Sequence, residues 1–330
     1  MDVAPWVWWT TLAVTAVALA VDVFVIGRRP HEPSMRESAR HLVGYVGAAV
    51  VFGIGVWILA GSRYGGEFFA GWLTEYSLSV DNLFIFIIIM GKFAVPRQFQ
   101  QTVLLVGIVI ALVMRGLFIA VGAAAITHFS WVFYLFGAFL VLTAVNLVRE
   151  GNEEDQQYDE PRLVRWLRKH VPLAEGWDGV RLTTRSGSAD ARRAFTPMFL
   201  VVITIGITDL LFALDSIPAI YGLTSEPYLV LTANVFALMG LRQLYFLIGG
   251  LLERLVYLSY GLALLLAFIG VKLVLHALHE NELPFVNGGE HVSWAPEIPI
   301  WLSLVVIVGI LVVTAVASLV KDRRDRTPPA

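Results

Sequence analysis

The chain contains no cysteine among its 330 residues and carries few charged side chains. Without cysteine it has no disulfide, no thiolate metal ligand and no dithiol redox pair of its own. It also lacks a Walker motif, a nucleotide-binding glycine-rich loop and a serine–histidine–aspartate set, so the sequence supports neither direct use of ATP nor an enzyme. The net charge of −2 gives no indication of nucleic-acid binding.

Hydrophobic residues take the place of the missing charges. They make up 57% of the chain, whereas charged residues make up 15%, against about a quarter in soluble domains. The apolar stretches are about 20 residues long, enough to cross a hydrocarbon layer of ~30 Å. We therefore expect an all-α polytopic membrane protein with nine transmembrane helices. The predicted spans are 6–26, 42–60, 68–90, 100–125, 130–148, 197–221, 228–250, 254–276 and 298–320.

Lysine and arginine are sorted by side of the membrane. Of the 24 in the chain, 20 lie in alternate loops and the C-terminal tail, and one, Arg63, lies in the other set of loops. Because cytoplasmic loops are enriched in positive residues, this split places the N-terminus outside and the C-terminus in the cytoplasm of a multi-pass protein of the inner, or plasma, membrane. The predicted domains are a first membrane half (1–148), a cytoplasmic linker (149–196), a second membrane half (197–320) and a tail (321–330).

Two of the predicted spans carry the same pattern of acids. In each, an acidic residue is followed six residues later by an aspartate and then by a small polar residue. An acid at the centre of a bilayer costs roughly 3 kcal/mol on insertion scales, so such residues are usually functional. The residues are Glu75, Asp81 and Asn82 in the span 68–90, and Asp209, Asp215 and Ser216 in the span 197–221.

The two acidic spans are predicted to cross the membrane in opposite directions. Transporters often build a midplane site from inverted-topology repeats of this kind. The following spans agree moderately, since one contains Met114 and Arg115 and the other contains Met239 and Arg242. We therefore predict that spans three to five form a three-helix repeat with spans six to eight, around an acidic site.

The polar groups in these spans are oxygen donors, with no thiolate. Oxygen ligands favour Mn²⁺, Ca²⁺ or Mg²⁺ over softer metals. Crowded carboxylates in a low-dielectric interior can also exchange protons for metal. We expect no permanently bound cofactor, and a divalent cation and protons as transported partners. The predicted metal ligands are Asp81, Asp215, Glu75, Asp209, Asn82 and Asn234.

A structural role for the acids is the alternative. Arg115, Arg242 and Lys272 also lie within spans and could pair with the acids, either to hold helices together or to gate a path. The spans contain five acids, Asp22 included, but only these three bases, so pairing alone would leave carboxylates without a base. We expect an ion-pair or gating role for the three bases.

Regular helix geometry does not bring each acid pair onto one face. Residues six apart differ by about 120° around a helix, so Glu75 and Asp81 point in different directions. Pro218 removes one backbone N–H and favours local unwinding near Asp215, with a similar break expected near Asp81. From the predicted boundaries, Asp81 and Asp209 lie near mid-span, whereas Glu75 and Asp215 lie toward the outside.

The segment 149–196 begins acidic and then turns basic. Around residues 162–171, apolar residues share one face of a possible helix and arginine and lysine occupy the rest. Such a helix would suit the surface of an anionic inner leaflet. A solvated linker between the two membrane halves is an equal alternative.

Five stretches carry a specific pattern: Glu75–Phe84, Val113–Gly116, Trp131–Leu140, Thr208–Ile220 and Asn234–Phe246. These stretches resemble the TerC/Alx integral membrane proteins. The resemblance implies an inverted repeat related to LysE-type exporters, and a link to Mn²⁺ export, tellurium resistance and the alkaline response. It leaves two alternatives: a membrane scaffold that helps protein complexes or metal loading of exported proteins, and a membrane redox modulator. An oligomer or a protein partner is compatible with each.

Overall fold

The protein is described here by a computed structural model. Several helix residues have a described backbone but no described side chain, among them Asp22, Asp81 and Asp215. The described residues are 3–28, 34–129, 131–150, 162–174, 176–185, 193–248, 257–279, 281, 283, 286–287, 290, 292 and 294–326.

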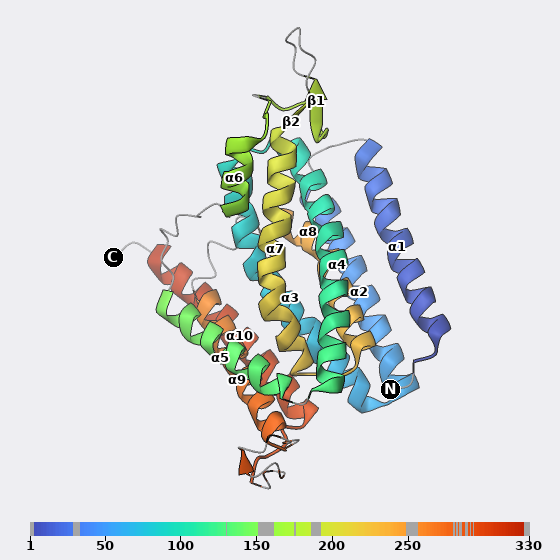
Figure 1. Cartoon of the computed structure of the whole chain (residues 1–330), viewed down its shortest axis with the longest axis vertical. Coiled ribbons are helices and arrows are strands. Elements are labelled where there is room, and N and C mark those ends of the chain that lie inside the picture. The colour runs from blue at the N-terminus through green and yellow to red at the C-terminus, as the bar shows by residue number, and fades with distance from the viewer. Residues whose placement is uncertain are drawn as a thin grey trace.

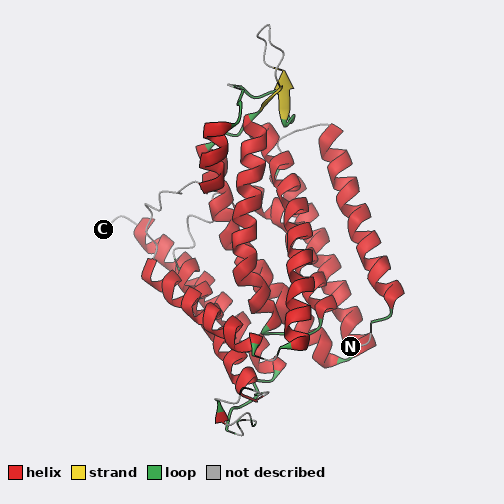
Figure 2. Cartoon of the chain, in the orientation of Figure 1, coloured by secondary structure: helices red, strands yellow, loops and turns green. Residues whose placement is uncertain are grey.

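Long helices form a bundle that carries a small cap at one end (Figures 1 and 2). Eight of the described helices are long and apolar enough to cross a membrane, which confirms the all-α polytopic fold. The helix α1 has 24 residues but is not one of these eight, so the number nine stays a prediction. The long helices are α1 (Pro5–Arg28), α2 (Met35–Ala60), α3 (Ser62–Lys92), α4 (Arg97–His128), α5 (Val132–Glu150), α7 (Pro197–Tyr221), α8 (Pro227–Ile248), α9 (Leu258–His279) and α10 (Ile300–Arg326).

The helices α2 and α3 begin earlier than predicted. The side chain of Ser34 accepts a hydrogen bond from the backbone N–H of Glu37 and so caps α2. The connection between the predicted spans 42–60 and 68–90 consists of Gly61 alone, whose φ of 105° is a backbone conformation that residues other than glycine rarely adopt. The predicted starts were wrong because polar first turns of helices resemble loops in composition.

The helix α3 lies at the centre of the bundle and packs against α2, α7, α8 and α10. It runs antiparallel to α7: the start of α3 meets the end of α7, and the start of α7 lies at the end of the bundle that carries the cap (Figure 1). The pairs α3–α8 and α4–α7 both pack closely, as do α5 and α9. A two-fold relation between α3–α5 and α7–α9 would produce this pairing, although the repeat itself stays a prediction.

The predicted helix breaks do not occur. The helix α3 runs without interruption through Asp81, and α7 runs through Asp215 and Pro218 to Tyr221. The carbonyl of Pro218 still accepts a hydrogen bond from Gly222 at 3.0 Å. A proline removes only one N–H from the ladder, and the surrounding helices keep the remaining turns in place.

The region predicted as a linker is folded wherever the structure describes it. Residues 162–174, 176–185 and 193–196, here called the cap, contain the short helix α6 (Arg162–His170) and the antiparallel strands β1 (Thr183–Arg185) and β2 (Arg193–Phe195). Val164 of α6 is fully buried, and the ring centres of Trp177 and Phe99 lie 6.2 Å apart. The cap is therefore attached to the ends of the membrane helices.

The helices α5 and α9 touch backbone to backbone. A Cβ atom built on Gly270 would lie 2.9 Å from the carbonyl oxygen of Gly137, and one built on Gly137 would lie 2.8 Å from the carbonyl oxygen of Gly270. Small residues allow two helix backbones to approach this closely. The resulting van der Waals packing holds the helices together, because a lipid environment provides no hydrophobic driving force for helix association.

We expect Gly270→Ala to lower the stability of the protein in detergent by about 1–3 kcal/mol, because the added methyl group overpacks this contact. Thermal unfolding measures the effect. Gly309→Ala on α10 is the matched control, since a Cβ there meets nothing within 4 Å. Equal melting temperatures for the two variants would contradict the close contact.

Candidate functional site

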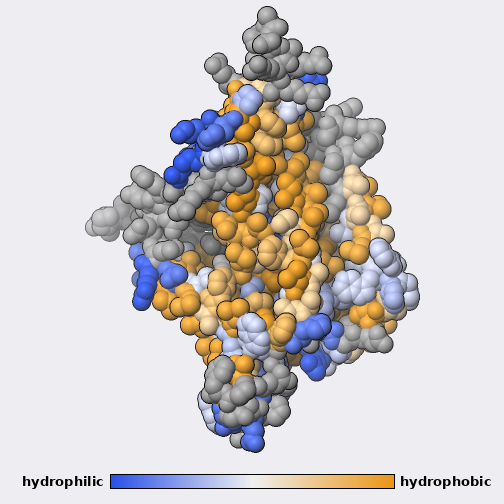
Figure 3. All heavy atoms as spheres, in the orientation of Figure 1, coloured by the Kyte–Doolittle hydropathy of each residue, from blue (hydrophilic) through white to orange (hydrophobic). Residues whose placement is uncertain are grey.

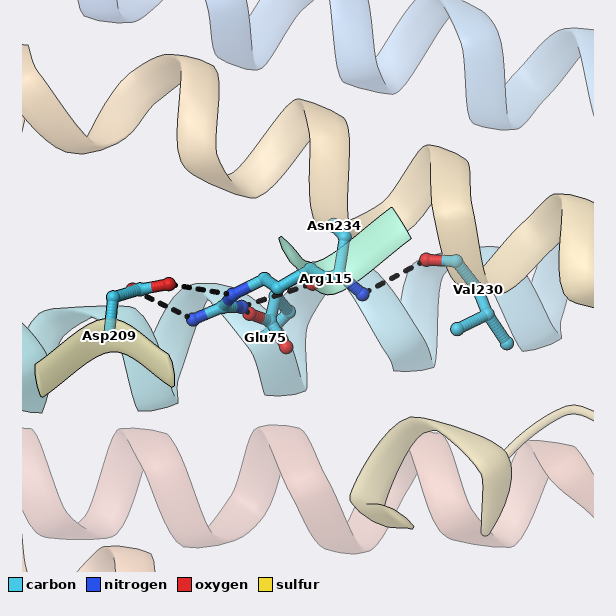
Figure 4. Close-up of polar contacts among 5 residues, drawn as sticks. All are labelled: Glu75, Arg115, Asp209, Val230 and Asn234. Carbon is cyan, nitrogen blue, oxygen red and sulfur yellow. Dashed lines mark hydrogen bonds and ion pairs between the residues drawn. The ribbon is translucent and has the colours of Figure 1, made fainter. Parts of the chain in front are cut away.

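A buried guanidinium joins the candidate residues at the centre of the bundle. Nη1 of Arg115 on α4 forms an ion pair with Oε1 of Glu75 on α3. Nη2 and Nε of Arg115 donate hydrogen bonds to the two carboxylate oxygens of Asp209 on α7, at 3.2 and 3.4 Å. Nη1 also donates to Oδ1 of Asn234 on α8 at 3.0 Å. One side chain thereby connects four membrane helices (Figure 4).

All four side chains are removed from solvent, with exposures of 1% or less. The amide of Asn234 is oriented by its own helix, since Nδ2 donates to the carbonyl of Val230 at 3.0 Å. The oxygen of that amide therefore faces Arg115 (Figure 4). Arginine suits this position because its planar fork reaches several acceptors at once, which a lysine ammonium does not match.

The cluster holds more negative than positive groups. Two carboxylates face one guanidinium, which leaves a formal charge of one negative when all are ionised. Oε2 of Glu75 has no hydrogen-bond partner among the described residues. A buried net charge is costly in low dielectric, so this cluster is suited to attract a proton or a cation.

The structure changes the expected depth of the acids. Glu75 and Asp209 bind the same guanidinium, so they lie at one level, whereas the predicted boundaries placed Glu75 further outside. The error arose because α3 begins at Ser62, which puts Glu75 near the middle of the helix. Asp81 and Asp215 each lie six residues further along antiparallel helices, about 9 Å from this level in opposite directions.

The faces next to these acids are polar and buried. Ser79 and Asn82 on α3 and Ser216 on α7 have exposures of 1%, 5% and 1%. On regular helices Ser79 and Asn82 share a face with Glu75, and Ser216 shares one with Asp209. The hydroxyl oxygens of Ser79 and Ser216 have no hydrogen-bond partner within the described part of the chain. The side chains of Asp81 and Asp215 lie outside the described residues, so their role as ligands stays a prediction.

The other two bases are placed differently from Arg115. Lys272 on α9 donates a hydrogen bond to the hydroxyl of Ser303 on α10 at 3.1 Å. Arg242 is buried on α8, eight residues beyond Asn234 and so about 12 Å along the helix. An ion pair of the kind predicted for the three bases is present at Arg115, which pairs with Glu75 and Asp209.

A third buried carboxylate, Glu67, was missed by the sequence reasoning. Glu67 on α3 is 5% exposed, accepts a hydrogen bond of 2.6 Å from the hydroxyl of Thr224 after α7, and pairs with Nε of Arg63 at 2.9 Å. The predicted span begins at residue 68, which leaves Glu67 in the preceding loop. The signal was the spacing of four residues between Arg63 and Glu67, which places them on one helix face. Arg63 is also the one base that lies in the loops predicted to be outside the cytoplasm. Its ion pair with Glu67 explains why a base occurs there.

No group of three or more histidine or acidic side chains close enough to hold a metal ion occurs among the residues that the structure describes. The buried acids among these residues are instead bound by Arg115, by Arg63 and by Thr224. In this arrangement both central acids are bound by Arg115, and the cluster keeps a formal charge of one negative when all three groups are ionised.

The fold and the buried charged cluster together define a multi-pass integral membrane protein with ionisable residues at its centre. The sequence model of one protein family, described as the integral membrane protein TerC family, matches residues 60–326. The chain belongs to this family.

Several bacterial proteins are similar over nearly the whole chain. An uncharacterized membrane protein of Mycobacterium tuberculosis is 47% identical, over 94% of this chain and 78% of its own length. A membrane protein of Myxococcus xanthus is 36% identical, over 99% and 96%. The Escherichia coli protein Alx, whose name describes it provisionally as a membrane-bound redox modulator, is 35% identical, over 98% and 97%. No solved structure matches the chain.

We expect Arg115→Met to destabilise the protein by about 3–5 kcal/mol, because it leaves two buried carboxylates without a counter-charge. Combining it with Glu75→Gln and Asp209→Asn should recover most of the loss. Thermal unfolding in detergent measures both variants. Arg181→Met, at a side chain that is 75% exposed, is the control and should change little. A triple variant no more stable than Arg115→Met would contradict the electrostatic account.

We also expect Thr224→Val to cost about 1–3 kcal/mol, because the buried carboxylate of Glu67 loses a hydrogen-bond donor. Thr224→Ser keeps the hydroxyl and should behave like the unmodified protein. The comparison uses thermal unfolding of the two variants, and equal losses would show that the hydroxyl does not hold the carboxylate.

Proposed function

We propose that this protein is a secondary transporter that exports a hard divalent cation, Mn²⁺ foremost and Ca²⁺ as a second substrate, from the cytoplasm in exchange for protons. The observation that carries the proposal is the convergence of α3, α4, α7 and α8 on a buried cluster with two carboxylates and one guanidinium. Such a cluster costs energy in a membrane and favours a function that uses its charge. The membrane is the inner, or plasma, membrane, with the cap on the cytoplasmic side.

The positions of the acids support movement across the membrane. Asp81 lies about 9 Å from the central level toward the cap, and Asp215 lies about 9 Å from it in the opposite direction. The two outlying acids thus stand before and after the central pair along the path of a cation. Asn82, Ser79 and Ser216 add oxygen donors of the kind that a hard cation accepts when it loses water.

Arg115 provides a mechanism for gating. In the present arrangement its guanidinium forms ion pairs with Glu75 and Asp209, so a dication and the guanidinium compete for the same carboxylates. Arrival of a dication at Asp81 or Asp215 weakens the hold of Arg115 through like-charge repulsion. After the dication leaves, a proton from the other side on one of the two carboxylates, with Arg115 paired to the other, gives a neutral cluster and completes the exchange.

The redox reading suggested by the name of the Escherichia coli relative has less support in this chain. With no cysteine, it has no thiol of its own for electron transfer. The predicted scaffold role differs from transport in its dependence on the acids, since a scaffold does not require Asp81 or Asp215 to be ionised.

Flux of Mn²⁺ into inside-out vesicles tests the proposal. We expect Asp81→Asn and Asp215→Asn to lower the initial rate by at least about tenfold, since each removes a charged ligand from a hard-cation site. Asp178→Asn, at an acid of the cap that is 41% exposed, is the matched control and should transport normally. An imposed proton gradient should accelerate uptake by the unmodified protein.

Uptake that is unchanged in folded Asp81→Asn and Asp215→Asn proteins would overturn the transport proposal. If metal levels stay unchanged in cells while a protein complex is lost, the scaffold reading is favoured instead. A rate that does not respond to the imposed proton gradient would remove proton exchange from the proposal.

A further inference from the structure

The helix α6 presents an unusual surface at the rim of the bundle. It contains arginine or lysine at four of its nine positions and no acid. Arg165, Arg168 and Lys169 are exposed, whereas Val164 is fully buried and fixes the helix to the bundle. The guanidinium of Arg168 lies 5.4 Å from the ring centre of Phe93, just after the end of α3. The basic side chains are therefore held at the level where the membrane helices end.

An exposed aromatic pair accompanies the basic residues. Trp166 is 54% exposed, and its ring stacks on that of His170 with centres 4.8 Å apart. A tryptophan left this exposed on a fixed helix has its apolar ring available to an outside partner. Tryptophan is enriched at the headgroup level of membranes, where one part of the ring meets apolar chains and the N–H meets polar groups.

The position of α6 decides which partner fits. The helix lies at the perimeter of the bundle beside the cap-side end of α7 (Figure 1). A hydrophilic patch at its position borders the upper end of the hydrophobic surface of the bundle (Figure 3). A basic surface at this edge, next to an exposed tryptophan, is complementary to negatively charged headgroups rather than to a soluble anion.

We propose that α6 binds anionic phospholipid headgroups of the leaflet on the cap side, with Arg165, Arg168 and Lys169 as the charged contacts and Trp166 as the interfacial anchor. This binding holds the cap at the membrane surface, beside the end of α3 and the start of α7. The inference does not depend on which substrate the protein transports.

The absence of cysteine makes a labelling experiment direct. His170→Cys in the full chain takes an environment-sensitive fluorophore beside Trp166, and Leu182→Cys takes it on the exposed part of the cap. The proteins are placed in nanodiscs of phosphatidylcholine alone or with phosphatidylglycerol, and iodide quenching reports access to water. We expect the label at 170 to be shielded only with phosphatidylglycerol, and the label at 182 to be quenched equally in both.

Charge variants identify the residues responsible. Replacing Arg165, Arg168 and Lys169 together by glutamine should remove the shielding and lower retention of phosphatidylglycerol in native mass spectrometry by about tenfold or more. Replacing Arg36, Arg40 and Arg181 by glutamine removes equal charge at the same end of the bundle and should leave both readouts unchanged. A melting temperature equal to that of the unmodified protein verifies folding of each variant.

Three results would overturn the inference. The first is a label at 170 that is quenched equally in both lipids. The second is shielding that persists in the variant with three glutamines. The third is shielding that depends on an added soluble protein and not on phosphatidylglycerol, which would make α6 a protein-docking surface.

Discussion

The fold depends on the interaction of one arginine with two carboxylates in the buried centre of the bundle. Arg115 is in contact with Glu75, Asp209 and Asn234, and each of these residues comes from a different helix. In a low-dielectric interior these contacts are strong when complete and costly when one partner is missing. The relative positions of α3, α4, α7 and α8 are therefore fixed at their centre by charge, while apolar packing fixes the rest.

The class of the fold and the identity of the central residues could be predicted from sequence. Stretches of about 20 apolar residues have few alternatives to membrane helices, because every backbone polar group must be satisfied within the hydrocarbon. The acids were found because charge is rare in such segments. What could not be predicted was which acid meets which base, because the spacing within one helix carries no information on the register between helices.

The incorrect expectations share a physical origin at the ends and the interior of helices. Composition alone placed Glu67 in a loop, although the helix α3 continues for five residues before it. Proline at 218 suggested an unwound segment, but packing retains the helix despite the missing N–H. The depth of Glu75 followed from the wrong start of α3. Local rules thus failed wherever neighbouring helices determined the outcome.

The order of the charged residues along the chain has a consequence for biogenesis. Glu75 and Arg115 belong to consecutive helices, so they can pair as soon as α4 has left the translocation machinery. Asp209 follows Arg115 by 94 residues and enters a site whose charge is already balanced. Neither member of the first pair has to wait in lipid as an isolated ion for the second half of the protein to be synthesised, since the N-terminal half emerges first.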